Sequence, residues 1–141
     1  MSCVFCKVVE GRERASVVLR DDLCTAFLDI QPVTRGHVLI VPNRHAASVA
    51  ELDDESLAAM MRAAKKIDLA LRESTVACEG LTILLADGIA AGQKVPHAHL
   101  HLFPRYQGDG FGFVYPEGYS HGAPREELDA LAAELSAAVN A

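Results

Sequence analysis

The chain has 141 residues and lacks any apolar run that approaches the roughly 20 consecutive residues needed to span a membrane. Its first seven residues, which read MSCVFCK, also lack the basic and then apolar pattern of a secretion signal. These two absences predict a protein that does not insert into a membrane and that resides in the cytoplasm.

Positive charge is scarce, because 13 Lys and Arg residues stand against 19 Asp and Glu residues, which gives a formal net charge of −6. Binding to nucleic acids or to anionic membrane surfaces requires a basic face that counters phosphate. We therefore expect neither kind of partner. A small anion in a local pocket is still compatible with this charge balance.

Cysteine is also scarce, and four cysteines in a cytoplasmic protein are poor evidence for disulfides. Cys24 and Cys78 are isolated in the sequence and are expected to be small buried apolar residues. The glycines at 108, 110 and 112 lack the following Lys-Ser/Thr pair of a phosphate-binding loop, so this stretch is expected to be a flexible loop. We find no internal repeat or linker, and the length and composition predict a single domain over residues 1–141.

Five short segments are predicted to be strands, and their short connections favour antiparallel pairing. They are residues 17–20, 23–28, 37–41 and 81–85 and the histidine-rich stretch from His97. Asp53 is expected to cap a helix whose apolar stripe comprises Leu57, Met60, Met61, Ala64, Ile67 and Leu71. Pro124 is expected to open a C-terminal helix with an apolar face of Leu128, Leu131, Leu135 and Val139.

Three histidines, His97, His99 and His101, alternate with Ala98, Leu100 and Leu102. Successive side chains on a strand face opposite ways, so the pattern predicts three imidazoles on one face and three apolar side chains in a core. An imidazole is a competent nucleophile or general acid near neutral pH. The stretch is therefore the strongest candidate for chemistry, and a half-exposed strand that is merely rich in histidine is the alternative.

Cys3 and Cys6 have the spacing of half a tetrahedral zinc site. Two further ligands are required, and the candidates are His45 and one end of the histidine row. A pair of free thiols is the alternative. A thioredoxin-like role is weaker, because that motif should follow a strand and open a helix, whereas this one begins the chain.

The loop before the histidines contains Asp87-Gly88 and Gly92-Gln93, and it suits a close approach of backbone N–H groups to an anion. Glycines also serve turns for geometry alone, so the signal depends on the neighbouring histidines. Asp29 follows the second predicted strand. It is a candidate to accept hydrogen bonds from sugar hydroxyls, or it simply forms a turn.

With these residues assembled, the chain resembles the histidine triad (HIT) family, whose signature alternates three histidines with apolar residues. The triad here begins at His97, and the match runs over about residues 3 to 105, leaving a C-terminal loop and helix over 106–141. The matching segments, in order, are Cys3-x-x-Cys6, Phe27-Leu-Asp-Ile30, Gly36-His-Val-Leu-Ile-Val-Pro42, Ala91-Gly-Gln93 and the triad. The triad with Gly-Gln before it is a highly specific pattern.

The resemblance implies an α+β HIT-like fold: a five-stranded antiparallel sheet, one main helix and a C-terminal helix, dimerised into a ten-stranded sheet. It also implies a homodimer that binds purine nucleotides and transfers or hydrolyses a nucleotidyl group, as in histidine triad nucleotide-binding proteins. His99 would attack the α-phosphorus and form a covalent nucleotidyl-histidine, while His101 and His37 bind phosphate oxygens and assist the leaving group.

The same resemblance implies the substrate contacts and the metal. Gln93 and the backbone N–H groups of residues such as Gly92 and Val95 would hold the phosphate. Asp29 would contact the ribose. The base pocket would be lined by Phe27, Leu28 and Ile30. One structural zinc ion per chain would be held by Cys3, Cys6, His45 and His97, without touching the substrate.

His101 stands where relatives that transfer nucleotides carry Gln, which favours hydrolysis of nucleoside phosphoramidates or dinucleoside polyphosphates. Two residues depart from the family pattern: Ala86 replaces an Asn or Gln that holds phosphate, and Lys94 replaces a Ser or Thr near the leaving group. A nucleotide-binding regulator with vestigial hydrolase activity is therefore an alternative. A second enzyme hypothesis places a catalytic metal on the histidine row itself.

Overall fold

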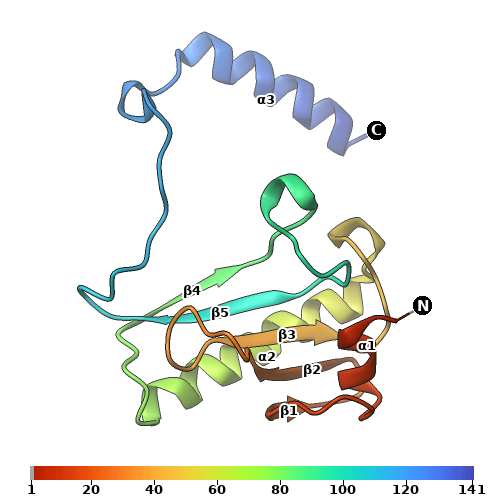
Figure 1. Ribbon diagram of the computed structural model, residues 1–141. Helices are drawn as coiled ribbons and strands as arrows, with labels where there is room; N and C mark the ends of the chain where they lie inside the picture. The colour runs from red at the N-terminus through yellow and green to blue at the C-terminus, as the bar shows by residue number, and fades with distance from the viewer. Residues whose placement is uncertain (1) are drawn as a thin grey trace. The chain divides into compact units, whose positions relative to one another are not determined.

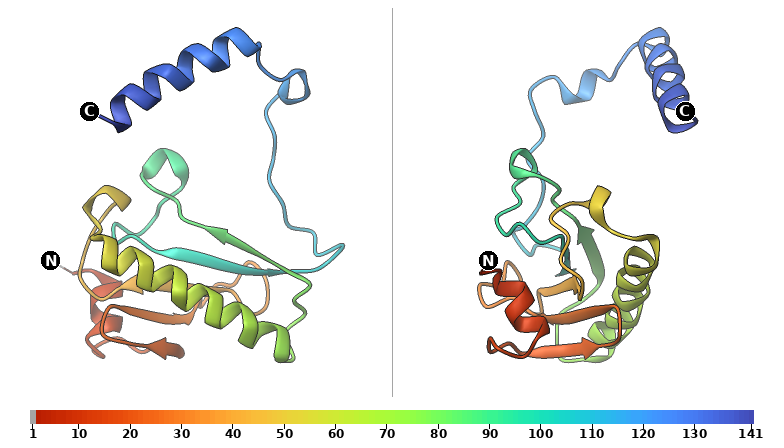
Figure 2. Two further views of the ribbon diagram at one scale, coloured as in Figure 1. Left: turned by 180° about the vertical axis from the view of Figure 1, so that it is seen from behind. Right: turned by 90° about the vertical axis from the view of Figure 1, so that its right-hand side faces the viewer.

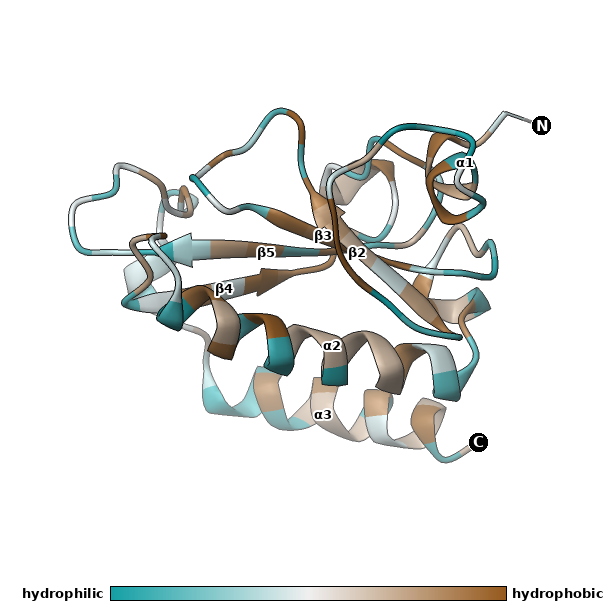
Figure 3. Cartoon of the chain, turned by 90° about the horizontal axis from the view of Figure 1, so that it is seen from below, coloured by the Kyte–Doolittle hydropathy of each residue, from teal (hydrophilic) through white to brown (hydrophobic). Residues whose placement is uncertain are grey.

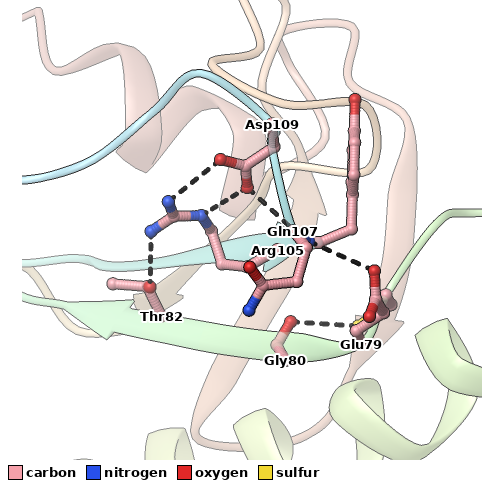
Figure 4. A network of polar contacts seen from close by, with 8 residues as sticks. Glu79, Gly80, Thr82, Arg105, Gln107 and Asp109 are labelled. Atoms are coloured by element: carbon pink, nitrogen blue, oxygen red, sulfur yellow. Dashed lines mark hydrogen bonds and ion pairs between the residues drawn. The ribbon is translucent and has the colours of Figure 1, made fainter.

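The computed structural model describes residues 2–141, which divide into a larger unit ending at Gly110 and a smaller unit from Phe111 to Ala141. The boundary lies five residues beyond Arg105, where the resemblance to the family signature was expected to end. Asp109 explains the difference, because its carboxylate accepts two hydrogen bonds from Arg105, at 2.7 and 3.1 Å. Arg105 also donates to Thr82, and Gln107 donates to Glu79, so this turn stays attached to the sheet (Figure 4).

A five-stranded antiparallel sheet forms the centre of the larger unit, in the order β1-β2-β3-β5-β4 (Figure 1). The strands are β1 Val17–Arg20, β2 Cys24–Leu28, β3 Val38–Pro42, β4 Gly80–Leu84 and β5 Leu100–Arg105. The prediction of an α+β fold with such a sheet is confirmed. The first four strands lie within one residue of the predicted segments at each end.

Helix α2, Asp54–Glu73, packs on one face of the sheet, and Asp53 caps it by accepting a hydrogen bond from the backbone N–H of Ser56. The predicted cap and helix are confirmed, but Met61, which was expected in the apolar stripe, is 47% exposed. A helix turns about 100° per residue, and this takes Met61 off the face on which Met60 is buried. Hydrophilic and hydrophobic residues alternate along α2, as its amphipathic pattern requires (Figure 3). Its apolar face, including Met60, Ala63 and Ile67, packs on inward-facing residues such as Ile40 and Leu102.

A short helix, α1 Val4–Val9, lies on the opposite face of the sheet from α2 (Figure 2). It buries Phe5 and Val8 in a second core cluster with Phe27, Leu39 and Val41. This helix was not predicted from the sequence. Cys3 is its N-cap, so the Cys3–Cys6 motif does open a helix.

The histidine stretch departs from its prediction, because only His101 lies within β5, which begins at Leu100. The pairing of β5 with β3 ends at Leu100, opposite Ile40. Before that point the backbone N–H of Ala98 donates to the carbonyl of Ala46 at 2.7 Å, outside the sheet. His97 and His99 therefore lie on an irregular segment that leads into the strand.

The smaller unit contains the predicted C-terminal helix, α3 Arg125–Val139, with Pro124 at its N-cap. Within residues 2–141 the chain also forms three short 3-10 helices. They are η1 Val49–Glu51 and η2 Ile89–Ala91 in the larger unit and η3 Tyr119–His121 in the smaller one. Over residues 2–141 we find no helix with the length and apolar character to cross a bilayer.

Candidate active site and metal centre

The structure brings together the four residues expected to bind a metal. Cys3 caps α1, Cys6 lies within it, His45 follows β3, and His97 precedes β5. One ligand atom from each side chain lies within 4.8 Å of the others. Segments far apart in the sequence therefore converge on one cluster of two sulfur and two nitrogen donors.

The spacing of these donors fits a tetrahedral metal ion. Bond lengths typical of zinc place neighbouring ligand atoms about 3.3 to 3.8 Å apart. Nδ1 of His97 lies 3.3 Å from Sγ of Cys3, 3.6 Å from Sγ of Cys6 and 3.2 Å from Nδ1 of His45. The Sγ of Cys6 lies 3.3 Å from Nδ1 of His45.

His97 is oriented as a ligand by its other ring nitrogen. Nε2 donates a hydrogen bond to the carbonyl of Pro42 at 2.9 Å, which leaves the lone pair of Nδ1 directed at the cluster. The side chain is fully buried, and burial lowers the pKa of His97 below its ordinary value. The neutral form, which metals bind, is therefore the form present at neutral pH.

His99 is buried and presents one free ring nitrogen. Its Nδ1 donates a hydrogen bond of 2.7 Å to the carbonyl of His97, so Nε2 carries the lone pair. The ring of Phe5 packs edge-on against it, with the centroids 5.1 Å apart. Burial lowers the pKa of His99, which keeps the imidazole neutral and nucleophilic at pH 7.

A chain of hydrogen bonds runs from the backbone of Val33 through His37 to His101. The N–H of Val33 donates to Nδ1 of His37 at 3.2 Å, so the ring proton of His37 lies on Nε2. That Nε2 donates to Nδ1 of His101 at 3.0 Å, which leaves the proton of His101 on its own Nε2. His101 thus presents a hydrogen-bond donor beside the lone pair of His99, with ring centroids 4.8 Å apart.

Burial is the main reason that the rings of His37 and His101 are neutral. Burial lowers the pKa of His37, and the nearby Asp29 carboxylate opposes that shift. Burial, followed by the neighbouring His99 and His37, lowers the pKa of His101 to about 4. Oδ2 of Asp29 lies 3.6 Å from Nε2 of His37, too far for a hydrogen bond, so its influence is electrostatic.

Asp29, His37 and His101 also lie close enough to share a metal ion. The hydrogen bonds argue against that use. A metal needs a lone pair on Nε2 of His37, but Nδ1 already accepts the N–H of Val33, so Nε2 holds the proton. His37 and His101 form a hydrogen-bonded pair instead. The hypothesis of a catalytic metal on the histidine row is therefore disfavoured.

The loop between β4 and β5 brings Gly92 and Gln93 ahead of the histidines, as expected. The side chain of Gln93, however, is bonded to backbone groups of Gly88, Ala47 and Val95. The expectation that this amide holds phosphate directly is therefore not matched by the geometry. The backbone N–H of Gly92 is also engaged, because it donates to the carbonyl of Ile89 at 2.9 Å. The backbone N–H of Val95 is a separate candidate.

The three residues expected to line a base pocket do not share one face. Phe27 pairs with Leu39, and Leu39 pairs with His101, so these side chains lie on the histidine face of the sheet. Leu28 is the next residue of β2 and points the other way, into a groove with Ile67 and Leu71 of α2. The placement of Leu28 in the pocket is wrong for that reason. Ile30, beyond the strand, is 97% exposed.

Two groups that shape the candidate site were not predicted from the sequence. Phe5 lies between the two cysteines, and its apolar character there was a signal that α1 packs on the site. The backbone N–H of Val33, which fixes the proton on His37, left no sequence signal, because any residue but proline supplies that donor.

Comparisons with known proteins identify the family to which the chain belongs. The sequence-family model of the HIT domain matches residues 10–108. The adenosine 5'-monophosphoramidase hnt1 of Schizosaccharomyces pombe is 36% identical over 140 residues, 99% of each chain. A zinc-bound histidine triad family protein from Mycobacterium smegmatis is 38% identical, with a TM-score of 0.76 over 98% of both chains. The histidine triad nucleotide-binding protein of Candida albicans is 31% identical, with a TM-score of 0.85 over 99% of this chain and 98% of that one.

Proposed function

Since the chain belongs to the HIT family, we propose that it is a purine nucleotidyl hydrolase that works through a covalent nucleotidyl-histidine on His99. The substrates are nucleoside phosphoramidates or dinucleoside polyphosphates, cleaved at the α-phosphate. The observation that carries the proposal is the orientation of His99, whose Nδ1 is bonded to the carbonyl of His97 while Nε2 is left as a nucleophile. The activity of the fission yeast relative supports the same reaction class.

In the first step, Nε2 of His99 forms a bond to the α-phosphorus, and the bond from phosphorus to the leaving nitrogen or oxygen breaks. An anionic phosphate favours the charged form of nearby imidazoles, so substrate binding adds one proton to the pair of His37 and His101. His101 passes a proton from its Nε2 to the leaving group. The leaving group departs as an amine or as a nucleoside polyphosphate.

In the second step, water attacks the phosphorus of the nucleotidyl-histidine. The Nε2 of His101 takes a proton from that water, and the bond between phosphorus and His99 breaks. The nucleoside monophosphate is released, and His99 returns to its neutral form. The histidine at position 101, in place of the glutamine of transferase relatives, supports water as the acceptor.

Substrate binding is assigned to groups around these histidines. The backbone N–H of Val95 holds the α-phosphate, and Asp29 accepts hydrogen bonds from the ribose. Phe27 and Ile30 contact the purine. Asp29 suits its role because only Oδ1 is engaged, by the N–H of Gln31, while Oδ2 is near His37.

We further propose that Cys3, Cys6, His45 and His97 hold one structural zinc ion per chain. The two-sulfur, two-nitrogen donor set and the zinc-bound relative support this choice of metal. Zinc at this centre would tie α1 and the segment after β3 to His97. A cytoplasmic homodimer with a continuous ten-stranded sheet completes the proposal.

The test is the intact mass of the protein after brief, acid-free quenching with adenosine 5'-phosphoramidate or diadenosine tetraphosphate. Wild type should show a transient AMP adduct and release AMP. His99→Ala should show neither, and His121→Ala, which removes a histidine of the smaller unit, should behave as wild type. Turnover that persists in His99→Ala would overturn the mechanism. Nucleotide binding without adduct or turnover would favour the regulatory alternative.

A further inference from the structure

The two N–H donors and the oxygen of the Gln93 side-chain amide are all hydrogen-bonded to backbone groups. Oε1 accepts the N–H of Gly88 at 2.7 Å. Nε2 donates to the carbonyls of Ala47 and Val95 at 2.8 and 3.0 Å. An amide has two N–H donors, so none is left for a phosphate oxygen.

These bonds join three separate segments of the larger unit. Gly88 begins the turn that contains η2 in the loop between β4 and β5 (Figure 1). Ala47 lies two residues after His45, and Val95 lies two residues before His97. One side chain therefore connects the loop to both segments that contribute histidines to the metal centre.

The loop has little else to hold its shape. Residues 87–92 are exposed, and Ile89 is 91% exposed. Gly88 and Gly92 have φ angles of +93° and +91°, a conformation that suits glycine and that also permits many alternatives. Apart from its own turn bonds, the loop is attached by the carboxylate of Asp87, which accepts the N–H of Val49.

Gln93 closes this loop by bonding to both the N–H and the carbonyl of Gly88. The N–H of Gly88 donates to the side chain of Gln93, and the carbonyl of Gly88 accepts the backbone N–H of Gln93 at 3.1 Å. The turn from residue 88 to residue 93 is thereby fixed as a ring. The orientation of the N–H groups that follow it depends on that ring.

We propose that Gln93 is a positioning residue that sets the geometry of the phosphate-binding loop without contacting the phosphate. The inference rests on the proposed function, in which the backbone N–H of Val95 holds the α-phosphate. Misplacement of a reacting group by about 1 Å costs on the order of 10²-fold in rate. Loss of the Gln93 side chain should therefore lower kcat/KM by about 10- to 100-fold.

The experiment measures amide hydrogen exchange by NMR in the unliganded protein, together with kcat/KM for adenosine 5'-phosphoramidate. In Gln93→Ala, exchange at Gly88 should rise at least about tenfold, because its acceptor is removed. Exchange at Ile40, in the central strand β3, should stay as in wild type. Gln93→Glu retains an acceptor for Gly88 but loses both donors, so it should keep Gly88 protected while the loop separates from Ala47.

Ile89→Ala is the matched control, because it removes an exposed side chain from the same loop and no bond from Gly88. Unchanged exchange at Gly88 in Gln93→Ala would overturn the inference, as would increased exchange with unchanged kcat/KM. Equal increases at Gly88 and Ile40 would indicate a general loss of stability and would also overturn it. Wild-type protein that shows neither adduct nor turnover would refute the proposed function and, with it, the positioning role of Gln93. Exchange at Gly88 would still show separately whether Gln93 fixes the loop.

Discussion

The imidazoles of His37 and His101 share a hydrogen bond of 3.0 Å between Nε2 of His37 and Nδ1 of His101. The residues are 64 positions apart in the sequence, and the pairing of β3 with β5 brings them together. Because Val33 fixes the proton of His37 on Nε2, the proton of His101 is fixed in turn on the nitrogen that is free to meet a substrate. The sheet thus sets the position of the proton on His101 through the neighbouring His37.

Removing His37 should therefore slow nucleotidyl transfer to His99. In His37→Ala, His101 loses its partner and both of its tautomers become accessible, so we expect the rate of adduct formation to fall by about 10²-fold. His37→Gln retains an N–H donor at a similar reach and should lose less. Rapid-quench measurement of the AMP adduct checks both variants, and a wild-type rate in His37→Ala would contradict the relay.

The depressed pKa of His101 makes the folded protein sensitive to acid. In the unfolded chain the group protonates near its ordinary pKa of 6.5, whereas in the folded protein that pKa is about 4. Between these values the unfolded state binds more protons, so the free energy of unfolding falls as the pH drops from about 6.5 towards 4. Above pH 6.5 the contribution is fully present.

Thermal unfolding at a series of pH values measures this effect. His101→Gln lacks the titrating group, so its melting temperature should fall less than that of wild type over the same interval. Comparing the two proteins removes the contributions of the other histidines, which are common to both. Parallel curves for the two proteins would show that His101 does not titrate as described.

Gly36 has a backbone conformation and tight surroundings that suit glycine, and substitution there should destabilise the protein. Its φ is +90°, and an added Cβ would lie 3.0 Å from Cγ1 of Val76. We expect Gly36→Ala to lower the free energy of unfolding by about 1 to 3 kcal/mol. Gly80→Ala is the control, because a Cβ there meets nothing within 4 Å, and it should change stability by no more than about 0.5 kcal/mol. Chemical denaturation distinguishes the two.

Much of the fold follows from local sequence patterns. Short apolar runs bounded by turn residues predicted β1 to β4, and Asp53 predicted the start of α2, because both signals act over a few neighbouring residues. Helix α1 was missed because six residues are too few for a helical period to stand out. The start of β5 was misplaced because a tertiary bond from Ala98 to Ala46 diverts the chain there, and such a bond has no local signal.

The candidate site, like the fold, could be predicted only in part from the sequence. Residue types and spacing, together with the resemblance, brought forward the ligand cluster and His99, because their chemistry requires particular side chains. The hydrogen bonds of Gln93 to Gly88, Ala47 and Val95 could not be predicted, since the identity of a residue does not reveal the partners of its amide. Leu28 was misassigned because grouping it with Phe27 overlooked the alternation of side chains along a strand.

The metal centre should contribute to stability more than to chemistry. A ligand present at about 1,000 times its Kd stabilises the folded state by about 4 kcal/mol. Removing zinc with a chelator should therefore lower the melting temperature by about 10 °C. Cys6→Ser should reproduce the loss and reduce the metal content measured by mass spectrometry. Cys78→Ser, which changes a cysteine outside the cluster, should retain both metal and stability.

Chemistry should survive at temperatures where the metal-free protein is still folded, because His99 is oriented by the carbonyl of His97 and packed by Phe5. We expect adduct formation in the chelated protein at 10 to 20 °C below its melting temperature, a margin of about 3 kcal/mol or more. Chelation that abolishes the adduct while leaving the melting temperature unchanged would contradict this prediction. That outcome would restore a catalytic metal on Asp29, His37 and His101, which the proton on Nε2 of His37 argues against.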